Sequence, residues 1–150
     1  MENVFDVAKY ILEKTGSISA MKLQKLVYYS QVWHIVWEEE ELFSDKVSAY
    51  SNGAVIGTLF HEHKGMFKVR SEDFPQGNSE RLSDPVKEDI DKVVDFYGKY
   101  TAQQLSDLNH REKPWIDARK GLSPGEPCNN PITPAAIMEY YSGLSNAQES

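Results

Sequence analysis

The sequence predicts a mainly α-helical, compact single-domain fold around a long central helix, with a short two-stranded β ribbon. Three observations lead to this expectation. The 150 residues suit one domain with a proper core. The stretch MKLQKLVYYSQVWHIVW is apolar on most sides of a helix, which is typical of a helix that its neighbours bury. Further amphipathic segments with capping residues precede and follow this stretch.

The first two helices follow from apolar spacing and from capping residues. The range Val4 to Lys14 carries apolar residues at helical spacing, with Asn3 as the N-cap and Gly16 as the stop. Ser19 is the expected N-cap of the central helix. The acidic run Glu38 to Glu41 opposes the helix macrodipole, so we expect the central helix to end there.

The middle of the chain predicts the β ribbon and one short helix. Alternation that starts at Val47 predicts a strand that ends at the Asn52-Gly53 pair. A short helix that stops at Gly65 is expected from the spacing of four apolar residues, Val55, Ile56, Leu59 and Phe60. The segment MFKVR, residues 66–70, predicts a second strand, which would pair with the first.

Two further helices are marked by their starts and ends. Ser83 with Pro85 predicts a helix start, and Gly98 predicts the end of that helix. Thr101 and Gln104 fit a capping box at the start of the next helix. Both helices therefore have start signals that do not depend on apolar spacing.

The C-terminal part of the chain is expected to hold two more helices. Pro114 opens a short one within PWIDARKG. The last helix is expected to begin at Thr133-Pro134 and to end at Gly143. The domain is therefore expected to span residues 1–144, with residues 145–150 as a disordered tail.

The formal net charge of −7 and the single cysteine narrow the classes of function. Nucleic-acid binding draws most of its affinity from Lys and Arg on phosphates, so direct nucleic-acid binding is not expected. A protein partner with a basic surface fits the charge better. Cys128 alone permits neither an intramolecular disulfide nor a thiolate zinc site, which suits a cytoplasmic protein. The N-terminus does not resemble a signal peptide, and no apolar run reaches the ~20 residues of a membrane span, so no membrane association is expected.

The four histidines are the first candidates for chemistry, and none forms a recognised motif. His61 and His63 are two residues apart, whereas the helical zinc motif places its histidines four apart. His34 lies on the apolar face of the central helix, either as a buried histidine or as part of a binding site. The chain has no G-x-S-x-G elbow and no phosphate-binding glycine loop. We therefore expect no catalytic residue, no cofactor and no metal.

The segment LNHREKPWIDA, residues 108–118, concentrates charged and aromatic side chains between two helices. His110 closes one helix, and Pro114 opens the next. Trp115 has the size to fasten this corner to the core. Arg111 and Glu112 are expected in solvent or paired across the turn. The segment can therefore serve the fold, a partner site or both.

Four segments of the chain carry a family resemblance. MKLQKLVYYSQVWHIVW is similar to the pattern KLQKLLYYAQGWHL, and LSDLNHREKPWIDARKG is similar to LS.LTH.E.PW..AR.G. LFSDKVSAYSNGAVIGTLFHEHKG and NNPITPAAIMEYY match in the expected order but are less distinctive. The patterns are those of the Panacea domain of phage-associated proteins of the GepA and SocA type, and the resemblance runs from Val4 to Tyr141. The chain departs from the pattern at Tyr50, Ala54, Phe60 and Asn109, where the family has Trp, Pro, Tyr and Thr.

The resemblance implies an antitoxin-type domain that neutralises a cognate toxin protein by direct binding. For a SocA-type member it implies an adaptor that delivers the toxin to a cytoplasmic protease. It implies no catalytic activity, no cofactor and no metal. The candidate partner contacts are polar and aromatic residues, because interface energy concentrates in such side chains: Gln24, Tyr28, His34, Tyr50, His110 and Trp115.

Two other classes of function stay open on the sequence. A small hydrolase or metal-dependent enzyme would use His34 or His110. An interaction domain of a phage regulator is a further alternative, because the resemblance extends to relatives fused to DNA-binding modules. The acidic charge argues against DNA contact by this chain itself.

Overall fold

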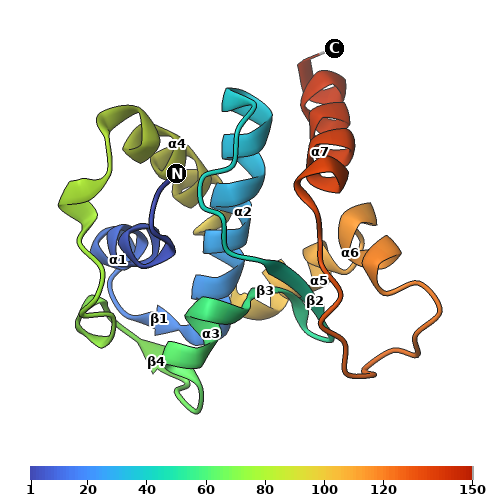
Figure 1. The fold of residues 1–150 in the computed structure, drawn as a ribbon, viewed down its shortest axis with the longest axis horizontal. Coiled ribbons are helices and arrows are strands. Elements are labelled where there is room, and N and C mark those ends of the chain that lie inside the picture. Colours follow the sequence, from blue (N-terminus) through green and yellow to red (C-terminus); the bar gives the residue numbers. More distant parts are fainter. Residues whose placement is uncertain (150) are drawn as a thin grey trace.

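The computed structural model describes residues 1–149, with side chains described through residue 144. Within these residues it has seven α-helices: α1 (Val4–Thr15), α2 (Ala20–Glu38), α3 (Gly57–His63), α4 (Asp84–Tyr97), α5 (Ala102–Asn109), α6 (Lys113–Ala118) and α7 (Pro134–Glu149). Four short strands accompany them: β1 (Ile18–Ser19), β2 (Val47–Tyr50), β3 (Gly53–Ile56) and β4 (Lys68–Val69). The predicted mainly α-helical class with a short β ribbon is confirmed (Figure 1).

Helix α2 runs through the middle of the fold, with α1, α4, α5 and α7 packed around it (Figure 1). Most of its 19 residues are buried, which confirms the prediction of a central helix that its neighbours bury on most sides. Its N-cap is Ser19, whose hydroxyl accepts a hydrogen bond from the backbone N–H of Lys22 at 3.1 Å. The helix ends at Glu38, and Glu39 takes a left-handed conformation with φ of 59°. The acidic run therefore terminates α2 as predicted.

Predicted capping residues occupy the ends of α1, α4 and α5. Asn3 caps α1 by accepting a hydrogen bond from the N–H of Phe5, and Gly16 follows the last residue of α1, which is one residue longer than predicted. Thr101 and Gln104 form the predicted capping box of α5, with each side chain accepting from the other residue's backbone N–H. Local sequence therefore decides where these helices begin and end.

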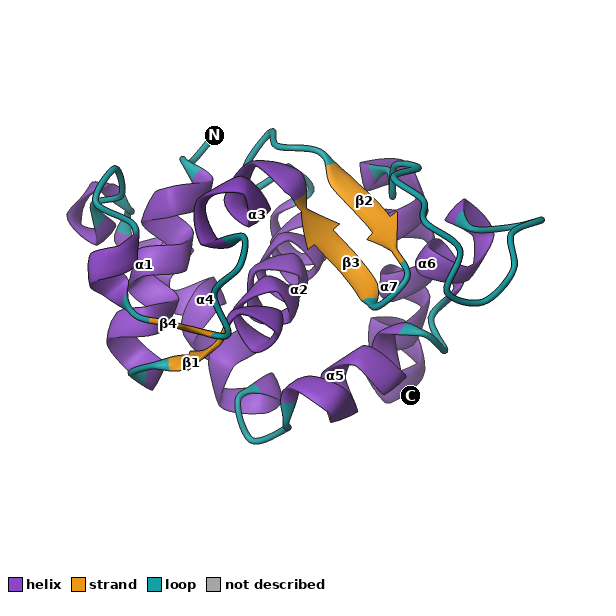
Figure 2. Cartoon of the chain, turned by 90° about the horizontal axis from the view of Figure 1, so that it is seen from below, coloured by secondary structure: helices purple, strands orange, loops and turns teal. Residues whose placement is uncertain are grey.

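The β ribbon is a hairpin of β2 and β3, which corrects the predicted pairing. Tyr50 pairs with Gly53 across a two-residue turn, and Val47 pairs with Ile56. The sequence predicted a helix that included Val55 and Ile56, but α3 begins only at Gly57. All four residues of β3 are buried, so their apolar character fits a buried strand as well as a helix. Figure 2 shows this hairpin alongside α2, and β3 contacts that helix.

The second predicted strand exists but pairs with a different segment. β4 is antiparallel to β1, with Ile18 opposite Val69. The two-residue β1 lies between α1 and α2, where the sequence has no alternation that would predict a strand. The expectation that residues 66–70 pair with residues near Val47 was therefore wrong. The strand that contains Val47 is β2, and it pairs with β3 across the two-residue turn.

The C-terminal segment returns along the hairpin before it forms α7. The N–H of Ala49 donates to the carbonyl of Asn130 at 2.8 Å, and the N–H of Ile132 donates to the carbonyl of Val47 at 2.8 Å. Helix α7 then starts at Pro134 as predicted but continues past Gly143 to Glu149, so the predicted end was wrong. Side chains from position 145 onward and the whole of Ser150 lie outside the described residues. The disordered tail over residues 145–150 stays a prediction.

Candidate functional site

A buried carboxylate organises the space between α2, α5 and α7. Glu112 is only 5% exposed, and its Oε1 accepts hydrogen bonds from the hydroxyls of Tyr29 at 2.6 Å and Tyr141 at 2.8 Å. The side-chain amide of Asn109 donates to the same oxygen at 3.3 Å. We call Tyr29, Asn109, Glu112 and Tyr141 the Glu112 network. Burial raises the pKa of the Glu112 carboxyl, while its hydroxyl and amide donors act in the opposite direction.

Asn109 connects the Glu112 network to the hairpin. Its side-chain oxygen accepts the backbone N–H of Ala54 at 2.6 Å, and the Nζ of the buried Lys25 lies 3.3 Å from the carbonyl of Ala54. Burial lowers the pKa of Lys25 to about 8. A Cβ on Gly53 would lie 2.6 Å from Cε of Lys25 and 2.9 Å from Oδ1 of Asn109, so this position requires glycine.

Three of the predicted contact residues meet at the surface above this interior. The indole ring of Trp115 stacks on the imidazole of His110 with centroids 4.3 Å apart, and its N–H donates to the carbonyl of Tyr50 at 2.8 Å. The ring of Tyr50 meets Phe60 edge-on at 5.9 Å. All four side chains are partly exposed. We call Tyr50, Phe60, His110 and Trp115 the aromatic corner.

The aromatic corner is held in place by Arg119 and by the helix boundary at His110. The guanidinium of Arg119 donates to the carbonyl of Ala49 at 2.9 Å, and its Cζ lies 5.3 Å from the centroid of the Trp115 ring. His110 is the C-cap of α5, and α6 begins at Lys113 with Pro114 next to it. The predicted role of the segment, with Trp115 fastening the turn between two helices, agrees with these contacts.

The imidazole of His110 is electrostatically unusual. Its Nε2 is the one fully enclosed side-chain polar atom that has no hydrogen-bond partner among the described residues. Burial lowers the pKa of this histidine, and the positive charge of Lys25 lowers it further. His110 therefore favours the neutral form, in which its ring stacks on Trp115 without carrying a charge.

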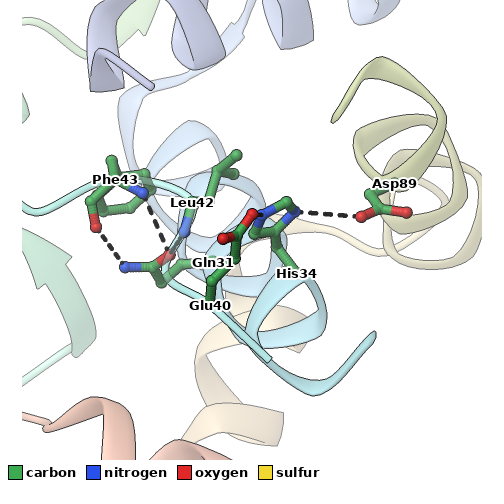
Figure 3. Close-up of polar contacts among 6 residues, drawn as sticks. All are labelled: Gln31, His34, Glu40, Leu42, Phe43 and Asp89. Carbon is green, nitrogen blue, oxygen red and sulfur yellow. Dashed lines mark hydrogen bonds and ion pairs between the residues drawn. The ribbon is translucent and has the colours of Figure 1, made fainter. Parts of the chain in front are cut away.

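His34 lies elsewhere, at the far end of α2, where it ties this helix to α4 (Figure 3). Its Nδ1 is 3.1 Å from Oδ2 of Asp89, and its Nε2 is 3.9 Å from Oε1 of Glu40. We call His34, Glu40 and Asp89 the His34 clasp. Burial raises the pKa of the Asp89 carboxyl, and Glu38 adds to the effect. Beside the clasp, Gln31 bonds the backbone of the chain that follows α2 (Figure 3).

Gln24 and Tyr28 occupy the interior. The amide of Gln24 bonds both the N–H and the carbonyl of Ile56, and its Nε2 lies 2.9 Å from Nε2 of His63. The hydroxyl of Tyr28 lies 3.1 Å from that of Tyr141. Gln24 is 1% exposed and Tyr28 is fully buried. These two predicted contact residues therefore engage the hairpin and α7, and they present no surface from which a partner could be reached directly.

Sequence reasoning missed the members of the Glu112 network and placed Glu112 in solvent or in a pair across the turn. The structure corrects this prediction, because the turn after α5 directs Glu112 inward while Arg111 stays exposed. The available signal was a pair of tyrosines in α2, because the hydroxyls of tyrosines in a buried helix need hydrogen-bond acceptors. Pairing Tyr29 with an acid 83 residues away requires the tertiary structure.

No metal-binding cluster accompanies the histidines in residues 1–144, whose side chains the structure describes. No group of three or more His, Cys, Asp or Glu side chains there is placed to hold a metal ion. No described Ser, Thr or Cys side chain hydrogen-bonds the ring of His34 or His110. Over the same residues, no helix combines the length and the apolarity that crossing a membrane requires.

Comparison with known proteins decides the family. The sequence model described as Antitoxin SocA-like, Panacea domain, matches residues 23–116, which is more than half of the chain. The chain belongs to this family. Neither the curated proteins nor the solved structures compared with it gave a match. The Panacea range reaches from α2 to α6 and contains the hairpin, the aromatic corner and Glu112, whereas Tyr141 of the Glu112 network lies beyond it.

Proposed function

We propose that this Panacea-family chain is an antitoxin that neutralises a cognate toxin protein by binding it directly. Family membership supports an antitoxin role in general, and the aromatic corner is the feature that carries the proposal. Partly exposed Tyr and Trp side chains on a rigid base are the usual anchors of protein interfaces. Here the base is rigid because Trp115, Arg119 and Asn109 all bond the backbone of the hairpin.

The charge of the chain indicates what kind of toxin surface fits. A net charge of −7 attracts a basic partner and speeds its encounter. The corner then supplies the apolar contacts that hold the complex. The proposed action is binding rather than catalysis, and it requires neither a cofactor nor a metal.

Coexpression with the product of the adjacent gene tests this proposal. We expect the two proteins to copurify and the growth defect caused by the toxin to be relieved. Replacing Tyr50 by Ala should weaken binding by at least about tenfold, because a central aromatic anchor is lost. Phe67, which is 79% exposed and lies between α3 and β4, gives the matched control Phe67→Ala with unchanged binding. If the wild-type proteins never associate and toxicity persists, the proposal fails.

Direct inhibition and delivery to a protease both begin with binding of the toxin. The amount of toxin that remains in the cell distinguishes the two. Direct inhibition predicts a stable complex in which the toxin persists after translation is blocked. The adaptor form predicts that the toxin disappears in cells and is restored when the cytoplasmic protease is removed. We propose direct inhibition as the primary form, because the corner offers a preformed contact surface.

A further inference from the structure

A second group of aromatic side chains, none of them shared with the aromatic corner, lines a groove. A groove of about 400 Å³ is bounded by Trp33 and Trp37 of α2, by Phe96 and Tyr97 of α4, and by Tyr100. We call it the aromatic groove. Trp37 and Phe96 are 40% and 52% exposed, so packing against the core leaves much of these two side chains accessible. An exposed surface of large aromatic side chains is a recognition feature more often than a packing one.

The aromatic groove also contains a buried acid. Glu112 is one of its lining residues, although 95% of this residue is removed from solvent because its exposure is 5%. All three hydrogen bonds to the carboxylate go to Oε1, and no described residue donates to Oε2. Among the described residues only His110 has a fully enclosed polar side-chain atom without a partner, so Oε2 is not fully enclosed, and because Glu112 lines the groove we infer that Oε2 faces it. A carboxylate oxygen in such a place has unused capacity to accept a hydrogen bond.

The ring faces around this acid already attract cations within the molecule. Nζ of Lys92 lies 5.2 Å from the ring centroid of Trp37. Nζ of Lys99 lies 5.2 Å from the ring of Phe96 and 5.3 Å from that of Tyr100. The negative face of an aromatic ring favours such positions. Aromatic walls with a free carboxylate oxygen at the base are the chemistry that receives an organic cation.

We propose that the aromatic groove receives an arginine side chain of the protein partner, whose guanidinium donates to Oε2 of Glu112 and stacks on the aromatic walls. Arginine fits better than lysine, because its planar and weakly hydrated guanidinium combines stacking with hydrogen bonding. This inference rests on the proposed function in one respect, namely that the partner is the toxin. The acidic run Glu38 to Glu41 begins next to Trp37, and the chain carries −7 overall, so the field around the groove favours a cation.

Lys92 makes the proposal sharper. It lines the groove and its ammonium lies over the ring of Trp37, so an incoming guanidinium competes with it. Replacing Lys92 by Gln is therefore expected to tighten arginine binding, whereas replacing Glu112 by Gln is expected to abolish the preference for a cation. A groove that only accepted apolar groups would respond to neither change.

A titration with a defined probe tests the chemistry of the groove without any toxin. The probe is N-acetyl-arginine methylamide, and its uncharged counterpart is the citrulline compound of the same shape. Binding is followed by NMR at the indole N–H signals of Trp33 and Trp37 over a series of pH values, because the proposed contact needs the ionised form of Glu112. We expect the arginine compound to bind at least about tenfold more tightly than the citrulline compound.

Matched variants decide whether Glu112 is responsible. Glu112→Gln keeps the oxygen that accepts from Tyr29 and Tyr141, so it is expected to fold, and its thermal melt checks this. It should lose the preference for arginine, while Glu62→Gln, an equal charge change on the exposed face of α3, should retain it. Equal binding of both compounds by the wild type, or an unchanged preference in Glu112→Gln, overturns the proposal.

Toxin binding supplies a second readout that separates the two proposals. If the toxin uses the groove, Glu112→Gln weakens its binding by at least about tenfold and Glu62→Gln does not. If Glu112→Gln binds and neutralises the toxin like the wild type, the groove proposal fails while the proposed antitoxin function stands. If the wild type never binds the toxin but still prefers the arginine probe, the antitoxin function fails and the arginine site stands.

Discussion

The Glu112 network and the His34 clasp both tie α2 to its neighbours through a buried carboxylate, but the two carboxylates differ in how many hydrogen-bond donors they satisfy. Oε1 of Glu112 accepts hydrogen bonds from three neutral groups, those of Tyr29, Tyr141 and Asn109. In the clasp, His34 bonds Asp89, and the side chain of its other partner, Glu40, is 74% exposed. Loss of Glu112 leaves three donors without their acceptor, whereas loss of His34 removes one hydrogen bond beside an exposed side chain, so the network should matter more for stability.

The largest expected effect is that of Glu112→Ala. This change leaves the hydroxyls of Tyr29 and Tyr141 and the amide of Asn109 without their acceptor in the interior. We expect a loss of about 3 kcal/mol in the free energy of unfolding, measured by urea denaturation. Glu112→Gln keeps one acceptor oxygen and should cost far less. Equal costs for the two variants would show that the network does not depend on that oxygen.

Gly53→Ala probes the contact between the hairpin and the Glu112 network. The added Cβ would lie 2.6 Å from Cε of Lys25, and Gly53 has φ of 121°, which L residues rarely adopt. We expect a loss of about 2 kcal/mol in the free energy of unfolding. Gly143→Ala is the matched control: it lies within α7 with no atom near the added Cβ, and it should gain about 0.5 kcal/mol.

His34→Ala should have a smaller effect. The change removes the hydrogen bond to Asp89, and the exposed side chain of Glu40 lies beside the vacated position, where water can enter. We expect a loss of about 1 kcal/mol in the free energy of unfolding, measured near neutral pH. The control Glu40→Gln should stay within about 0.5 kcal/mol of the wild type. A loss for His34→Ala as large as that for Glu112→Ala would overturn the comparison.

The smallest expected effect is a pH dependence that belongs to Glu112. Its pKa in the folded protein is raised above the usual value of 4.5 by burial, so folding favours the protonated acid. The resulting stability is fully present below pH 4.5 and is lost as the pH rises through the folded-state pKa. Tyr29, Tyr97 and Tyr141 around Glu112 have pKa values raised above 10, so they stay neutral in this range.

Comparison of the wild type with Glu112→Gln isolates the contribution of Glu112 to the pH dependence of stability. As the pH rises from 4.5, the free energy of unfolding of the wild type should fall relative to that of the variant, which cannot titrate at this position. Urea denaturation at a series of pH values measures the difference. A difference that does not change with pH would show that Glu112 has the same pKa in the folded and unfolded states.

Part of the candidate site was predictable, and the limit lies where distant segments meet. His110, Pro114 and Trp115 were placed correctly at a helix boundary, because caps and proline act on their own neighbours in the chain. Tyr50 could be chosen as an aromatic residue near a turn, but its carbonyl bond to Trp115 spans 65 positions. The inward orientation of Glu112 was not predictable, because an acid between two helices is expected in solvent unless buried hydrogen-bond donors lie within its reach.

The sequence by itself determined the helices with local start and stop signals, the buried character of α2 and the membership of the Panacea family. These features depend on capping residues, on apolar spacing and on short sequence patterns, each of which can be read from neighbouring residues. Only the tertiary structure decided that residues 53–56 form a strand, that β4 pairs with β1 and that Glu112 is buried. The physical reason is common to all three. A short apolar run does not by itself specify helix or strand, and a single acid does not by itself specify whether it is buried. Contacts with distant segments determine the conformation of the run and the environment of the acid.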